Sequence, residues 1–134
     1  MNKRILIIDD DPDVILFLST LLEDNGYRTL SAQNGREGLK LIESERPDLV
    51  LLDLMMPQKS GLSLLSEMKG RDELKEIPVI MVTGVAGETG IEFESFLDKK
   101  PGTSAGPALF RPDGYVEKPV DPDKLLALVK EVLK

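Results

Sequence analysis

The sequence predicts an α/β domain built on a doubly wound, five-stranded parallel sheet. Four-residue apolar runs occupy residues 5–8, 49–52 and 79–82, and each run is followed by an acid or a hydroxyl group, namely Asp9, Asp53 and Thr83. Apolar runs of this length between polar residues are typical of strands that are buried on both faces. Amphipathic helical segments alternate with these runs, which is the pattern of successive βα units.

The first half of the chain continues this pattern with two helices and two further strands. The first helix begins at Asp11 and Pro12, because a capping side chain followed by proline is a common helix start, and it ends at Gly26. Residues 27–32 predict the second strand. Residues 35–46 predict the second helix, with its apolar positions 39 and 42 facing inward, and residues 49–53 predict the third strand.

The second half is less regular. Residues 62–69 predict a helix and residues 78–83 the fourth strand. Asp121 and Pro122 repeat the cap-plus-proline pattern and begin the last helix, in which positions 125, 128, 129 and 132 form an apolar stripe. Thr83 and Lys118 are 35 positions apart, and the stretch between them is rich in proline and glycine. We expect a short helix at residues 91–99, followed by an extended loop at residues 100–113.

Composition limits the class of protein. The 134 residues match one domain, residues 1–134, which is long enough for a single core. The 24 acidic residues outnumber the 17 basic ones, and the formal charge of -7 argues against direct binding of nucleic acid. Cysteine and histidine are both absent, which argues against disulfides and a zinc site. Without an apolar signal segment or a membrane-length apolar run, we expect a cytoplasmic location and no membrane insertion.

The acids at the strand ends predict a metal site. The carboxyl ends of parallel strands meet at one edge of a sheet, so Asp9, Asp10 and Asp53 should converge there. Two carboxylates about 4 Å apart repel each other by roughly 4 kcal/mol at an effective dielectric constant near 20. Such a cluster therefore favours a bound cation, and oxygen ligands of this kind suit magnesium. Asp11 is expected only to cap the first helix.

Four motifs follow one another along the chain. They are Asp9-Asp10, then Asp53-Leu54-Met55-Met56-Pro57 with Gly61, then Thr83-Gly84, and finally Tyr115-Val116-Glu117-Lys118-Pro119. In this order they resemble the motifs of the response regulator receiver domain, the phosphorylatable part of bacterial two-component signalling systems. The resemblance covers essentially the whole chain and implies a flavodoxin-like strand order, 2-1-3-4-5, as in chemotaxis regulators. The long stretch between the fourth and fifth strands departs from the family and implies an irregular or shortened fourth helix.

The resemblance also implies a chemical role for the acids. Asp53 would accept a phosphoryl group from a kinase histidine. A magnesium ion, or manganese in its place, would be bound directly by Asp10, mainly through water by Asp9, by Asp53, and by the backbone carbonyl of Met55.

Further residues would respond to the phosphoryl group. Thr83 would hydrogen-bond a phosphoryl oxygen and Lys118 would pair with it, while Thr83 and Tyr115 would form a switch that alters a protein-interaction surface. Each also has a structural explanation: Thr83 could satisfy backbone groups, Lys118 could be a surface lysine, and Tyr115 could be a core residue. Neither Met55 nor Val85 can orient a water molecule by hydrogen bonding, which predicts slow loss of the phosphoryl group.

The expected partners are a sensor histidine kinase or phosphotransfer protein, and an unidentified downstream protein or effector domain. The chain is not expected to be an enzyme beyond its own phosphorylation and slow dephosphorylation. One alternative is a pseudo-receiver that signals by binding without phosphorylation. A phosphohydrolase of the haloacid dehalogenase type would need a second aspartate where this chain has Met55, and a flavodoxin-like electron carrier would need a hydroxyl-rich loop in place of Asp9-Asp10-Asp11.

Overall fold

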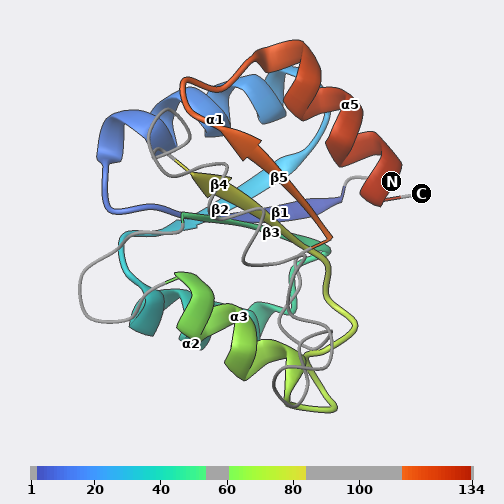
Figure 1. Ribbon diagram of the computed structural model, residues 1–134. Helices are drawn as coiled ribbons and strands as arrows, with labels where there is room; N and C mark the ends of the chain where they lie inside the picture. Colours follow the sequence, from blue (N-terminus) through green and yellow to red (C-terminus); the bar gives the residue numbers. More distant parts are fainter. Residues whose placement is uncertain (1–2, 54–60, 84–112, 134) are drawn as a thin grey trace, which may run out of the picture.

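The computed structural model describes residues 3–53, 61–83 and 113–133. Within these ranges, five strands form a single parallel sheet: β1 (Arg4–Ile8), β2 (Arg28–Ala32), β3 (Leu49–Asp53), β4 (Val79–Thr83) and β5 (Gly114–Glu117). Their order is β2-β1-β3-β4-β5, which confirms the predicted fold class and strand order (Figure 1). The predicted helix at residues 91–99, residues 100–112 of the predicted loop, and the residues Met55, Gly84 and Val85 lie outside the described residues.

Four described helices cover the two faces of the sheet: α1 (Pro12–Asp24), α2 (Gly35–Glu45), α3 (Gly61–Lys69) and α5 (Pro122–Val132). Helices α1 and α5 lie on one face, whereas α2 and α3 lie on the other (Figure 1). Right-handed connections between parallel strands produce this arrangement when the strand order reverses direction beside β1. In the described part of the chain, no helix is long and apolar enough to cross a membrane.

Alternate residues of the central strands enter two different cores. In β1, Ile5 and Ile7 belong to the core beneath α1 and α5, whereas Leu6 and Ile8 belong to the core beneath α2 and α3. The same alternation continues in β3 and β4. Burying an aliphatic side chain of this size stabilises the fold by about 1.5–3 kcal/mol. The two cores therefore pack against both faces of the central strands and determine where the carboxyl ends of these strands lie.

Helices α1 and α5 begin where the cap-plus-proline pattern predicts. The Asp11 carboxylate accepts a hydrogen bond from the Asp13 N–H at 2.9 Å, and the Asp121 carboxylate accepts one from the Asp123 N–H at 3.0 Å. Each cap satisfies a backbone N–H that has no partner within its helix. The role of Asp11 as a helix cap is thereby confirmed, and α1 begins directly after the acids that follow β1.

The helix ends show two left-handed residues. Gly26, which was predicted to end the first helix, has a φ of 93°, a conformation that glycine adopts without a steric penalty. Helix α2 ends at Glu45, one residue earlier than predicted, because Arg46 has a φ of 48° and acts as the helix cap.

Candidate functional site

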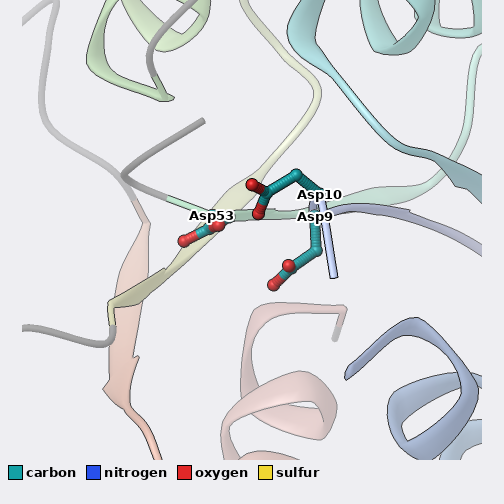
Figure 2. A group of neighbouring side chains, drawn as sticks. All are labelled: Asp9, Asp10 and Asp53. Atoms are coloured by element: carbon teal, nitrogen blue, oxygen red, sulfur yellow. The ribbon is translucent and has the colours of Figure 1, made fainter. Parts of the chain in front are cut away.

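Three aspartates meet at the carboxyl ends of β1 and β3. Asp53 is the last residue of β3, and Asp9 follows β1 directly; the pairing of Ile8 with Leu52 places these two acids level with each other. Carboxylate oxygens of Asp9, Asp10 and Asp53 all lie within 4.8 Å of one another. Figure 2 shows the three side chains together at this edge of the sheet. The predicted convergence of these acids is therefore present.

Two of the three acids are buried, and hydrogen bonds fix the position of one of them, Asp9. Asp9 is 1% exposed and Asp53 is 5% exposed, whereas Asp10 is exposed to solvent. The Asp9 Oδ2 atom accepts a hydrogen bond from Lys118 Nζ at 3.0 Å, and its Oδ1 atom accepts one from the Asp11 backbone N–H at 2.9 Å. Both oxygens of Asp9 thus have a donor, which lowers the cost of burying this carboxylate.

Lys118 is the cation of the site. It follows the last residue of β5, and its peptide bond to Pro119 is cis. Its Nζ atom lies 3.0 Å from Asp9 and 3.8 Å from Asp53. Burial is the largest influence on the pKa of Lys118 and lowers it, but the hydrogen bond to Asp9 and the negative charge of the three carboxylates together outweigh burial. The pKa of Lys118 is therefore raised, and the ammonium is charged throughout the neutral range.

The charge at this edge fits a divalent cation. Among the described residues, the cluster combines three carboxylates with one ammonium, so its negative charge exceeds its positive charge. The donors are all carboxylate oxygens at one edge of the sheet, and one of the three acids, Asp10, is exposed to solvent. Magnesium prefers oxygen ligands and retains several waters, so one or two of these carboxylates would suffice to bind it directly.

Two further predicted residues lie on neighbouring strands. Thr83 ends β4, one position beyond the residue that pairs with Asp53, so its backbone lies at the same edge of the sheet. Tyr115 lies on β5, paired with Met81, and is 37% exposed. A surface cavity of about 480 Å³ lies beside Tyr115 and extends to Lys118. Tyr115 is thus a surface residue beside the site rather than a core residue.

Sequence reasoning missed the contact that orients Asp9. The backbone N–H of Asp11, the residue that caps α1, donates to the Asp9 carboxylate two positions earlier. An aspartate that accepts a hydrogen bond from the N–H two residues later forms an Asx turn. Three consecutive aspartates before a helix start are the signal that could have indicated this turn.

Comparison with known proteins identifies the family. The family model "Response regulator receiver domain" matches residues 5–96, which is more than half of the chain. Protein PilH from Pseudomonas aeruginosa is 37% identical over 130 residues, which cover 97% of both chains. The alkaline phosphatase synthesis transcriptional regulatory protein PhoP from Bacillus subtilis is 34% identical over 134 residues, which cover all of this chain but 50% of PhoP.

Solved structures share the fold. The receiver domain of a CheY-like response regulator from Methanospirillum hungatei is 34% identical, with a TM-score of 0.78 and coverage of 99% of this chain and 94% of that chain. The receiver domain of the sensor histidine kinase PA1611 from Pseudomonas aeruginosa, whose active-site cleft holds a magnesium ion, is 20% identical, with a TM-score of 0.80 and coverage of 99% and 98%. The chain therefore belongs to the response regulator receiver domains, the signal-receiving domains of two-component systems.

Proposed function

We propose that Asp53 is the phosphoacceptor of this receiver and that its donor is a phosphohistidine on a sensor histidine kinase or phosphotransfer protein. The observation that carries this proposal is the position of Asp53: a buried carboxylate at the end of a central strand, 3.8 Å from the Lys118 ammonium and within 4.8 Å of two other acids. The ammonium, together with a cation held by the acids, would neutralise charge on the transferred phosphoryl group, which is the main requirement for phosphoryl transfer.

The transfer would proceed by displacement at phosphorus. A carboxylate oxygen of Asp53 forms a bond to phosphorus while the phosphorus–nitrogen bond of the donor histidine breaks, and the imidazole leaves with the electron pair and takes up a proton. The product is an acyl phosphate on Asp53. The Lys118 ammonium is close enough to Asp53 to pair with the phosphoryl oxygens, and its raised pKa keeps it charged for this role.

Magnesium is the proposed cofactor, and manganese would satisfy the same oxygen donors. Asp9, Asp10 and Asp53 would hold the ion, with the Met55 backbone carbonyl as a further proposed ligand. When bound, the ion would neutralise charge on the phosphoryl oxygens. The chain's own contribution is to hold the Asp9 carboxylate, one of the proposed ligands, through the Lys118 ammonium and the Asp11 backbone N–H.

Phosphorylation would alter the surface around Tyr115. We propose that Thr83 binds a phosphoryl oxygen and that Tyr115, exposed beside its cavity, changes position in response. A downstream protein or effector domain would read this surface. We also propose that the chain has no enzymatic activity beyond its own phosphorylation and slow dephosphorylation; the cytoplasmic location remains a prediction.

The donor protein would contact the start of α1, which begins beside the acid cluster. Leu16 is 65% exposed and Phe17 is 44% exposed on this helix, and both line a surface cavity of about 450 Å³. At a rise of 1.5 Å per residue, Phe17 lies about 8 Å along the helix from Pro12, the first helical residue. We propose that a protein that places a histidine over Asp53 also contacts these apolar side chains.

The proposal is tested by mass spectrometry. The protein is incubated with magnesium and acetyl phosphate, and the intact mass is compared for wild type, Asp53→Asn and the control Asp72→Asn. Asp72 has an almost fully exposed side chain and pairs with Lys75 in the loop after α3. A single phosphate-sized gain in wild type and the control, absent in Asp53→Asn, is the expected result. A gain that persists in Asp53→Asn contradicts the assignment, and no gain in any variant favours the pseudo-receiver.

A further inference from the structure

Asp113 pairs twice with Val79, immediately before the first residue of β5. The Asp113 backbone N–H donates to the Val79 carbonyl oxygen at 2.7 Å, and the Asp113 carboxylate accepts from the Val79 N–H at 2.8 Å. The regular pairing of the two strands begins one position later, with Ile80 opposite Gly114. The carboxylate of Asp113 therefore takes the place of a strand carbonyl and extends the ladder between β4 and β5.

The same carboxylate is tied to α3. The Lys69 ammonium, at the end of α3, lies 3.4 Å from the Asp113 Oδ2 atom that accepts from Val79. Lys69 also donates to the backbone carbonyls of Lys75 and Ile77, and its side chain is 13% exposed. Asp113 is thus fixed to the segment that leads from α3 into β4.

The side chains of β5 restrict its register only weakly. β5 has four residues that alternate between half-buried and exposed, and Val116 is its one residue that packs against a core cluster. Residues 84–113 connect it to β4, and a connection of this length can reach several registers. A slip of one residue would shift β5 by about 3.3 Å and turn each of its side chains to the opposite face.

Gly114 adds a steric restriction at the same place. A Cβ atom at this position would lie 3.0 Å from one methyl carbon of Leu128 and 3.1 Å from the other, on α5. A slip of one residue in either direction would bring Asp113 or Tyr115 to this position. The hydrogen bonds of Asp113 and the lack of room for a side chain at Gly114 therefore both favour the observed register of β5.

We infer that Asp113 is a positioning residue for the phosphorylation site, because it holds β5 in the register that brings Lys118 to Asp9 and Asp53. Lys118 follows the last residue of β5, so the register determines where its backbone leaves the sheet. The contacts of its Nζ atom at 3.0 Å and 3.8 Å depend on that point. The inference has a structural part, that Asp113 sets the register of β5, and a chemical part, that this register supports phosphorylation of Asp53. The chemical part rests on the proposed function, whereas the structural part does not.

The structural part is tested without any phosphodonor. Amide nuclear Overhauser effects between Met81 and Tyr115, which are partners in the wild-type register, are compared in wild type, Asp113→Ala and Asp113→Asn. We expect them to weaken or to give way to a second set in Asp113→Ala, and to return in Asp113→Asn, because an amide oxygen still accepts from the Val79 N–H. Asp72→Ala is the control for loss of an exposed aspartate. An unchanged pattern in Asp113→Ala overturns the inference.

The chemical part is tested by the rate of phosphorylation with acetyl phosphate and magnesium. Asp113→Ala is expected to react about ten-fold more slowly, since small misplacements of a site residue have effects of this size. Lys69→Met, which removes the ion pair and keeps the Val79 hydrogen bond, should show a smaller loss and provides a milder variant if Asp113→Ala does not fold.

A double-mutant comparison separates positioning from general damage. In a Lys118→Met background, Asp113→Ala should slow phosphorylation less than about two-fold further, because the residue through which it acts is gone. If Asp113→Ala slows phosphorylation by the same factor in wild type and in Lys118→Met, the inference is overturned. If wild type is not phosphorylated at all, the proposed function fails, and the cross-strand Overhauser effects still decide whether Asp113 sets the register.

Discussion

Lys118→Met is the substitution that tests the electrostatics of the site most directly. It keeps most of the aliphatic side chain and removes the ammonium that contacts two buried carboxylates. At an effective dielectric constant near 20, the contacts at 3.0 Å and 3.8 Å correspond to gross attractions of about 5 and about 4 kcal/mol. Desolvation of the lysine and of Asp9 offsets most of this, so we expect a net loss of about 1–3 kcal/mol in the free energy of unfolding.

The assay is urea unfolding followed by circular dichroism, in EDTA and in millimolar magnesium. In EDTA, Lys118→Met should show the full expected decrease in the free energy of unfolding, because Asp9 stays buried and loses its charged hydrogen-bond donor. Magnesium should stabilise the variant by about 1 kcal/mol more than it stabilises wild type, since the ammonium no longer competes for the same carboxylates. The gap between the two proteins should therefore narrow when magnesium is present.

The control is Lys40→Met, which removes a lysine from α2, on the other face of the sheet from α1 and α5. It should change the free energy of unfolding by less than about 0.5 kcal/mol in both buffers. Equal stability of Lys118→Met and wild type in EDTA would refute the reasoning, because the ammonium would then contribute nothing to the burial of the acids. A stability gap that magnesium leaves unchanged would refute the idea that the Lys118 ammonium competes with magnesium for these acids.

Four further predictions follow from the same structure. The stabilisation of the fold by Lys118 should be constant through the neutral range and decline only above pH 10.5. The reason is that a raised lysine pKa keeps the proton on the native state at pH values where the unfolded state has lost it. Urea unfolding of wild type and Lys118→Met across pH measures this decline. Asp11→Ala should lower the free energy of unfolding by about 1 kcal/mol through loss of the helix cap, which the same urea assay detects. Gly38→Val should cost about 1–3 kcal/mol, since a Cβ at this position would meet the buried Ile8 side chain, and thermal unfolding would detect it. Phe17→Ala should slow transfer from a phosphohistidine protein several-fold and leave the rate with acetyl phosphate unchanged; equal rates with the protein donor would exclude α1 as the contact surface.

The parts of the fold that the sequence predicts correctly are those with strong local signals. The buried strands appear as continuous apolar runs because both of their faces are covered. Helices α1 and α5 begin with a capping aspartate and a proline, and both starts agree with the structure. The acid cluster was predictable for a topological reason, since parallel strands place the residues that follow them at one edge.

The contacts that complete the site could not be predicted in the same way. Lys118 reaches Asp9 across 109 positions of sequence, and this contact requires β5 to lie in its observed place in the sheet. The pairing of Asp113 with Val79 and Lys69 is another long-range contact, and the motif pattern contains no sign of it. The boundary of α2 differs by one residue because Arg46 adopts a left-handed conformation without the glycine that usually marks it.

The distance in sequence between Lys118 and Asp9 has a consequence for protein synthesis. The acids at the ends of β1 and β3 emerge from the ribosome early, but their cation is on a strand that follows much later in the chain. At about 5–20 residues per second, several seconds separate translation of Asp53 from that of Lys118. We expect the nascent chain to be a poor phosphoacceptor during this interval, so that a kinase modifies finished receivers and does not transfer its phosphoryl groups to incomplete ones.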